Sequence, residues 1–427
     1  MLLELRAAYT AGGHTYPSGA VIAIGLDAFL AGDRRFDVLF EPTSTRSLDR
    51  GGIAFTRSRV LLTIQDNVVG HIEELWKEGG AWQRRTVTPP GKGALWARPL
   101  QREALADDPL AESYWIGYSD FLTPDSLFLA RTGTDTRELV KQRPQFFDAT
   151  GMRVEQAFAT SRDGTRVPYF IVWPRGAKAD GANPTLLYGY GGYQISMTPS
   201  YYAAFGRTWV ARGGVLVMSN IRGGGEFGPD WHRAAMKENK QRSYDDFIAV
   251  AEDLIGRKVT TPAHLGIEGG SNGGLLVGAA MTQRPDLFGA VVCQVPLLDM
   301  KRYSKLLAGA SWMAEYGDPD SPEEWAYIRR YSPYHQARPG VKYPRALFTT
   351  STRDDRVHPG HARKMVARLM EQGHDVLYYE NIEGGHGGAA DAKQRAHLNA
   401  LEISYLWMQL GPARQGAPGP TSPAARP

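Results

Sequence analysis

The sequence has a single cysteine, no long apolar run and no cluster of basic residues. Because Cys293 is the only cysteine among 427 residues, no internal disulfide is possible, and its apolar neighbours predict a buried side chain in a strand. No segment reaches the length of apolar chain that spans a bilayer, which argues against a membrane protein. The first six residues include an acid and a base where a signal peptide has its apolar core, so we expect a cytoplasmic protein.

An excess of charge of one sign is also missing. The 49 Lys and Arg residues oppose 45 Asp and Glu, and a net charge of +4 gives little support to a nucleic-acid or membrane-surface role. A content of 42% hydrophobic and 22% charged residues is typical of a globular protein, and the length suggests two domains. Residues 413–427, rich in Pro and Ala, are predicted to form a disordered tail.

The apolar pattern changes at about residues 145–155. Residues 1–148 contain only short apolar runs separated by Gly, Pro, Asp and Asn, which predicts an all-β domain. Residues 149–412 alternate apolar strands with amphipathic helices, which is typical of a doubly wound, mostly parallel sheet covered on both faces. The strands expected there are 185–188, 215–219, 265–269, 290–295, 346–350 and 376–381, and the helices lie near 244–255, 272–283, 361–372 and 393–409.

The run 265–274, LGIEGGSNGG, indicates a strand, a glycine-rich turn and a following helix, with Ser271 at the apex. This is the nucleophile elbow of an α/β-hydrolase. The glycines are needed because the serine backbone is strained and side chains beside it would collide with the neighbouring strand and helix. A bare G-x-S-x-G is weak evidence, and the flanking strand and helix strengthen it.

A nucleophilic serine needs a base, and the base needs a carboxylate that holds it in the right tautomer. In an α/β-hydrolase both follow the serine, in the order acid and then histidine. The expected strand at 346–350 runs into a loop with Asp354 and Asp355, between which the pattern does not decide. The strand 376–381 runs into a loop where His386 stands between two pairs of glycines.

The tetrahedral oxyanion of such a reaction needs hydrogen-bond donors. The N–H of Asn272, directly after the serine, is one by geometry. The second is expected from the loop 188–193, YGYGGY, where glycines bring backbone or a tyrosine hydroxyl close to the site.

No cofactor or metal is predicted. The glycine-rich loop 220–228 lacks the helix start and the Lys-Ser/Thr of a phosphate-binding loop, so a structural turn near the active site is expected. His358 and His361 share a helix face, but no acid or cysteine clusters with them, and we interpret them as surface or helix-start residues.

Several of these blocks together resemble the catalytic domain of the prolyl oligopeptidase family. They stand in one order and cover about residues 110–410: YGYGGY at 188–193, the loop 220–228, NKQ at 239–241 with YDDF at 244–247, 269–276 with RPDLFG at 284–289, DDRV at 354–357 and GHG at 385–387. The resemblance implies a serine peptidase that cuts short peptides, usually after proline, in a cavity capped by a β-propeller.

The resemblance also implies roles for individual residues. It makes Ser271 the nucleophile, Asp354 the orienting acid and His386 the base, and it adds the Tyr190 hydroxyl to the Asn272 N–H in the oxyanion hole.

For the substrate, the resemblance implies that Arg356 holds a backbone carbonyl and that proline stacks on Trp312. Further pocket walls are Tyr316, Tyr193, Leu297 and Val357. Tyr193 stands where phenylalanine is usual and Leu297 where valine is common, so strict proline preference is less secure than peptidase activity. An indole face suits the rigid proline ring and would give little to a charged side chain.

The chain departs from the family in its propeller. Residues 1–148 suffice for about three blades at 40–45 residues each, and three blades cannot close a ring. A C-terminal piece of a longer protein is therefore favoured over a shortened form with an altered lid. We expect an unstable or aggregation-prone chain, or a site open to larger substrates.

The alternatives are an esterase or acylaminoacyl-peptidase-like hydrolase, because the same triad cleaves esters, and an inactive truncated relic. The intact triad argues against the relic. The oligomeric state is left open.

Overall fold

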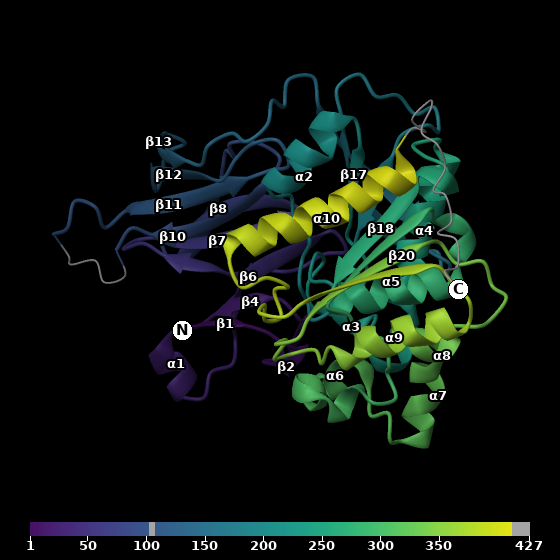
Figure 1. Ribbon diagram of the computed structural model, residues 1–427. Helices are drawn as coiled ribbons and strands as arrows, with labels where there is room; N and C mark the ends of the chain where they lie inside the picture. Colours follow the sequence, from purple (N-terminus) through teal and green to yellow (C-terminus); the bar gives the residue numbers. More distant parts are fainter. Residues whose placement is uncertain (102–106, 412–427) are drawn as a thin grey trace, which may run out of the picture.

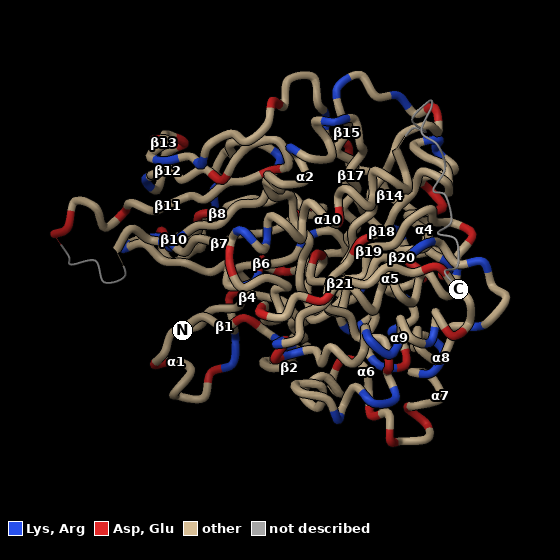
Figure 2. Tube along the Cα trace, viewed as in Figure 1, with Lys and Arg blue, Asp and Glu red and all other residues tan. Residues whose placement is uncertain are grey.

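The computed structural model describes residues 1–101 and 107–411, and the tail predicted for 413–427 lies outside them. Figure 1 shows two parts side by side, a set of small sheets from the start of the chain and a large sheet surrounded by helices. Lys and Arg alternate with Asp and Glu over both parts (Figure 2). Among the described helices, none combines the length and apolar character needed to cross a membrane.

The first part consists of antiparallel sheets. Their orders are β1-β4-β5, β2-β3, β6-β7-β8-β9 and β10-β11-β12-β13. The strands are β1 (Leu2–Glu4), β2 (Tyr9–Ala11), β3 (His14–Tyr16), β4 (Val21–Ala23), β5 (Asp37–Phe40), β6 (Arg46–Phe55), β7 (Val60–Asp66), β8 (Val69–Glu78), β9 (Ala81–Val87), β10 (Ala94–Pro99), β11 (Ser113–Ser119), β12 (Ser126–Arg131) and β13 (Arg137–Gln142). One short helix, α1 (Leu26–Leu30), interrupts a region where no helical pattern was expected.

The two four-stranded sheets stack face to face because their strands alternate apolar and polar residues. Leu61 and Ile72 of one sheet share a buried cluster with Leu95 and Ile116 of the other. On its opposite face the first of these sheets packs Leu62 against β4 and β5. This stacking of small sheets agrees with the predicted partial propeller, while the count of three blades and the boundary at residue 148 stay predictions.

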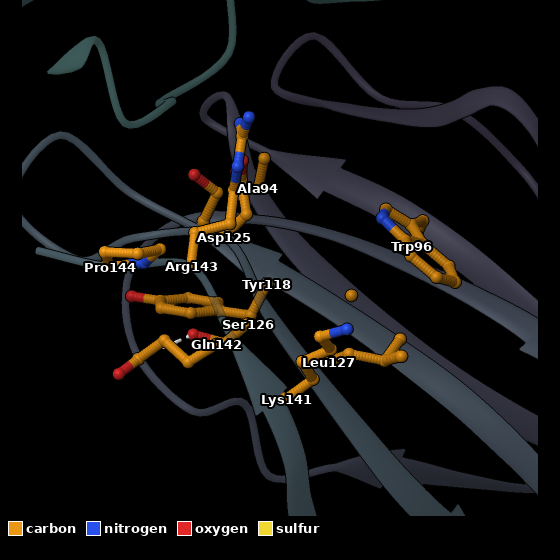
Figure 3. Close-up of a pocket in the computed structure, with 12 residues that line it drawn as sticks. Ala94, Trp96, Tyr118, Asp125, Ser126, Leu127, Lys141, Gln142, Arg143 and Pro144 are labelled. Atoms are coloured by element: carbon orange, nitrogen blue, oxygen red, sulfur yellow. Dashed lines mark hydrogen bonds and ion pairs between the residues drawn. The ribbon is translucent and has the colours of Figure 1, made fainter.

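The outer face of the sheet β10 to β13 holds a cavity of about 410 Å³. The Trp96 indole lies over Gly117, where an added Cβ would fall 1.9 Å from its ring. In Figure 3 this indole stands apart from the group formed by Asp125, Arg143 and Pro144. The cavity is therefore part apolar and part polar, and it belongs to the small sheets alone.

The second part is built on an eight-stranded sheet of order β14-β15-β17-β16-β18-β19-β20-β21. At one edge, β15 runs antiparallel to both of its neighbours, β14 and β17. The six strands β16 to β21 are mutually parallel. The strands are β14 (Arg153–Thr160), β15 (Arg166–Trp173), β16 (Thr185–Tyr188), β17 (Val215–Ser219), β18 (Leu265–Gly270), β19 (Ala290–Gln294), β20 (Ala346–Ser351) and β21 (Val376–Asn381).

Helices cover both faces of this sheet, because its central strands are apolar on both sides. α4, α5 and α9 share one buried cluster with Ile267 and Phe348, and α10 shares the other with Leu216 and Val292. The helices are α2 (Ala203–Thr208), α3 (Pro229–Arg233), α4 (Gln241–Gly256), α5 (Asn272–Gln283), α6 (Met313–Tyr316), α7 (Pro322–Tyr331), α8 (Pro333–Gln336), α9 (Gly360–Glu371) and α10 (Ala392–Leu410).

The predicted fold class is confirmed. Each of the six expected strands and four expected helices of the second part matches an observed element to within a few residues. The expectation for Cys293 is also correct, since it lies fully buried in β19. The hairpin β14–β15 and the short helices α6 to α8 were not predicted.

The two parts contact each other through hydrogen bonds and apolar side chains. Ser47 Oγ donates to the carbonyl of Glu226 at 2.9 Å, and the Tyr201 N–H donates to Ser119 Oγ at 3.0 Å. Phe121 enters the buried cluster that also contains α10. The small sheets are therefore held against the large one.

We expect Leu406→Ala to lower the free energy of unfolding by about 2–5 kcal/mol, because Leu406 lies on α10 and is fully buried against the sheet. Met408, 69% exposed on the same helix, is the matched control, and Met408→Ala should cost less than about 0.5 kcal/mol. Urea unfolding followed by circular dichroism measures both. Equal losses would contradict the packing of α10 on the sheet.

Candidate active site

Ser271 stands in a strained turn between β18 and α5. Its φ of 60° and ψ of −116° are unfavourable for an L-residue with a side chain. A Cβ on Gly269 would lie 2.4 Å from the carbonyl oxygen of Gly273, and a Cβ on Gly273 would lie 2.7 Å from that of Gly189. The sequence needs glycine there because the backbones are in contact, and the serine is left projecting from the apex.

Asp354 and His386 form a direct hydrogen-bonded pair. His386 Nδ1 lies 2.8 Å from Oδ2 and 3.0 Å from Oδ1 of Asp354. Asp354 is buried after β20, where its Oδ1 accepts the N–H groups of Arg356 and Val357, each at 2.9 Å. Asp355 is exposed, so the structure places Asp354 rather than its neighbour against the imidazole.

The loop that carries His386 is shaped by Asn381 at the end of β21. Asn381 Oδ1 accepts the N–H groups of Glu383 and Gly384, each at 2.9 Å. Asn381 thereby shapes the start of the loop, and Asp354 holds the imidazole itself.

A cavity of about 310 Å³ opens beside Ser271. Its lining brings together residues from five separate segments of the chain, and most of them were singled out in the sequence. They are Tyr190, Tyr193, Ile195, Ser271, Leu297, Ser311, Trp312 and Arg356. Ile195 and Ser311 are the two that sequence reasoning missed, because both are ordinary residues in loops without a motif.

Tyr190 and Ser271 both line this cavity. Burial raises the pKa of the Tyr190 hydroxyl, although Arg356 nearby and the Ser271 side chain act in the opposite direction. The phenol therefore keeps its proton near neutral pH and can donate it in a hydrogen bond.

The Asn272 side chain ties two walls of the site together. Its amide nitrogen donates to the carbonyl of Tyr190, and its Oδ1 accepts the Tyr316 hydroxyl at 2.7 Å. Tyr316 in turn packs edge-on against Tyr193, with ring centroids 6.0 Å apart. Asn272 thus fixes the position of the loop with Tyr190 through its side chain, a role the sequence did not suggest.

Two of the expected pocket walls do not line the cavity. Tyr316 has no exposed surface and lies behind Tyr193, and Val357 is 1% exposed with its N–H bound to Asp354. Both shape the site from behind.

A buried ion pair supports the loop between Tyr190 and Tyr193. Lys240 Nζ donates to the carbonyl of Gly191 at 2.9 Å and to Glu315 at 2.8 Å, and His232 Nε2 lies 2.7 Å from the second oxygen of Glu315. Burial opposes the charge of Glu315, but Lys240 and His232 outweigh it and lower its pKa to about 2. Lys240 stood in a block that carries the resemblance, yet no sequence signal showed that it is buried.

His361 is a helix-start residue, one of the two positions expected for it, but it is buried rather than on the surface. It is 1% exposed in the first turn of α9, and its Nδ1 accepts the N–H groups of Leu298 and Asp299 at 3.3 and 3.1 Å. Burial lowers its pKa to about 4, so the ring is neutral at pH 7. It holds the loop that carries Leu297.

The loop 220–228 is a structural turn beside the site, as expected. Buried Arg222 donates to Asp246 at 2.9 Å and to Asp163 at 2.6 Å, and the Gln194 N–H donates to the carbonyl of Gly223 at 3.1 Å. The loop therefore braces the segment that contains Tyr193.

Comparisons with known proteins agree with this architecture. Residues 201–413 match the model of the prolyl oligopeptidase family. The chain is 47% identical over 403 residues to an uncharacterized peptidase, y4nA, of Sinorhizobium fredii, covering 94% of this chain and 54% of that protein. It is 33% identical over 379 residues to a prolyl endopeptidase of Elizabethkingia meningoseptica, covering 88% and 52%. A post-proline cleaving enzyme from Rickettsia typhi superposes with a TM-score of 0.85 at 36% identity, covering 96% and 58%.

The fold is that of an α/β-hydrolase preceded by the sheets of a partial propeller. Within that class, the chain belongs to the prolyl oligopeptidase family. It spans about half the length of the curated relatives it matches.

We expect the free energy of unfolding to fall as the pH rises from 5 to 7.5, because the Glu226 carboxyl is buried in the loop 220–228. Burial raises its pKa from 4.5 to about 7, so the native state holds a proton that the unfolded chain releases between these values. Glu226→Gln should remove up to about 3 kcal/mol of this fall in the free energy of unfolding.

Urea unfolding at the two pH values measures the effect, and Glu238→Gln at an exposed position in the neighbouring segment is the control. The same fall in both variants would contradict a role for Glu226.

Proposed function

We propose that this chain carries the catalytic part of a serine peptidase that hydrolyses short peptides, on the carboxyl side of proline. The observation that supports it most is the cavity beside Ser271, which unites the Tyr190 hydroxyl, the Trp312 ring and Arg356 in one space. The names of the relatives from Elizabethkingia and Rickettsia typhi point to the same chemistry. The predicted location in the cytoplasm stays a prediction.

In the proposed mechanism, Ser271 Oγ attacks the carbonyl carbon while His386 takes its proton. Asp354, bonded to Nδ1, holds the imidazole in the tautomer whose Nε2 accepts that proton, and it stabilises the imidazolium that forms. His386 then gives the proton to the leaving amine, which departs and leaves an acyl group on the serine. Water, activated by the same histidine, releases the acid and restores Ser271.

The oxyanion of each tetrahedral intermediate would be bound by the Tyr190 O–H and the Asn272 N–H. The proline ring would stack on the half-buried Trp312 indole, with Tyr193 and Leu297 as the adjacent walls. Arg356 would hold a carbonyl of the peptide backbone. Apart from the hydrolytic water, this proposed chemistry uses only side chains and backbone of the chain.

The proposal is tested with three fluorogenic peptides that differ only in Pro, Ala or Arg before the cut. We expect the highest kcat/KM after Pro, and for Ser271→Ala a loss of about 10⁶-fold, because the acyl-enzyme does not form. Labelling of Ser271 by a fluorophosphonate separates an active site from a relic.

A preference for Ala or Arg would remove the claim for proline. Turnover of a matched ester without any turnover of peptides would favour the esterase.

We expect Tyr190→Phe to lower kcat by about 10²- to 10³-fold with little change in KM, because a donor to the oxyanion acts in the transition state. The control is Tyr9→Phe, at an exposed position of β2. Steady-state kinetics with the proline peptide measures both. An unchanged kcat would show that the Tyr190 hydroxyl does not stabilise the oxyanion.

A further inference from the structure

A second cavity, of about 260 Å³, adjoins the one beside Ser271. Tyr193 and Ser311 line both cavities, so a ligand that reaches past these two residues enters the second from the first. Its remaining walls come from both parts of the chain. Arg6 and Arg50 belong to the small sheets, and His232 and Glu315 belong to the hydrolase part.

The two arginines lie together. Both arginines line the cavity of about 260 Å³ and also a neighbouring narrow space of about 20 Å³. Gln194 lines the same two spaces. Arg6 follows β1, and Arg50 lies at the irregularity in β6, where the register shifts between Leu48 and Ile53. The small sheets thus contribute two arginines to the lining of one cavity beside the site.

Within the described part of the chain, only one of these two arginines has an ion-pair partner, and that partner, Glu4, does not line the cavity. Glu315 is the acid in the wall, but buried Lys240 already pairs with it at 2.8 Å. Arg6 has a loose contact of 3.5 Å with Glu4, in which the arginine side chain is 68% exposed. No ion pair of Arg50 is found among the described residues. Two like charges at one cavity repel each other, and an anion between them would relieve that repulsion.

We propose that this arginine cavity, defined by Arg6 and Arg50, is a subsite for a carboxylate of the peptide substrate, remote from the bond that is cut. The inference rests on the proposed peptidase function. A guanidinium presents paired N–H groups that match the two oxygens of a carboxylate. An ammonium group has no such pair, and an amide carries no charge. The carboxylate comes from an Asp or Glu side chain or from the C-terminus of the peptide.

Binding to Ser271→Ala tests the subsite without requiring turnover. The probes are labelled peptides with one proline, blocked at both ends, that carry Glu or Gln at each of positions two to four before the proline. A second series carries a free or an amidated C-terminus after it. We expect one carboxylate series to bind about tenfold more tightly than its neutral counterpart, as for a hydrogen bond to a charged group. Fluorescence anisotropy at low and high salt measures the ratio, which should shrink with salt.

Charge reversal locates the effect. In the Ser271→Ala background, Arg50→Glu and Arg6→Glu should abolish the preference for the carboxylate, and Arg50→Lys should keep part of it. Arg98→Glu makes the same change of charge in β10, outside the cavity, and should leave the preference intact. Equal binding of the Glu and Gln peptides, with equal binding of the two C-terminal forms, would overturn the proposal. A preference that survives reversal of both arginines would do the same.

The two levels of inference fail separately. If the wild-type chain cleaves the Gln peptide through Ser271 and no carboxylate binds better, the peptidase proposal holds and the subsite is wrong. If carboxylate peptides bind to Ser271→Ala through Arg6 and Arg50 while the wild-type chain cuts no peptide, the subsite holds and the peptidase is wrong.

Discussion

The left-handed backbone of Ser271 depends on close contacts with three neighbouring segments. Gly189 after β16, Pro296 after β19 and the first turn of α5 all approach so closely that a side chain on the elbow glycines would overlap them. A strained residue of this kind costs about 1–3 kcal/mol, which the burial of nearly all of α5 offsets. The same contacts bring the loops with Tyr190 and Leu297 to the serine. The close contacts that strain Ser271 are therefore the same contacts that assemble the site.

Polar groups, rather than apolar packing, set the fine position of the walls. Asn272 joins Tyr190 to Tyr316, and the buried pair of Lys240 and Glu315 holds the carbonyl of Gly191. Buried ion pairs add little net stability, but they have strict geometric requirements. They suit a loop that must aim a hydroxyl at one point. By contrast, the charges of Arg6 and Arg50 stay open to a ligand.

The sequence predicted the parts of the molecule where local pattern and tertiary structure agree. Apolar runs with flanking glycines located β18 and α5, since these features depend on residues close together in the chain. The order of motifs along the second part predicted His386 as the histidine that follows the acid. Asp354 and Asp355 could not be separated by pattern, because only the burial of one of them decides. Lys240 and His361 escaped for the same reason, because a charged or polar residue looks exposed until the fold covers it. Arg6 and Arg50 escaped because they are far apart in the chain and only the fold brings them to one cavity.

Arg6 and Arg50 precede Ser271 by more than half of the length of the chain, and no strand of the eight-stranded sheet contains either of them. Substitutions at these two positions touch neither the elbow nor the hydrogen bond between His386 and Asp354. Under the proposed function, a lineage could therefore change the charge that it prefers in its substrates by substitutions in the small sheets, with the chemical step under separate selection. On that proposal, substrate preference diversifies at the boundary between the two parts, without any change in the residues around Ser271.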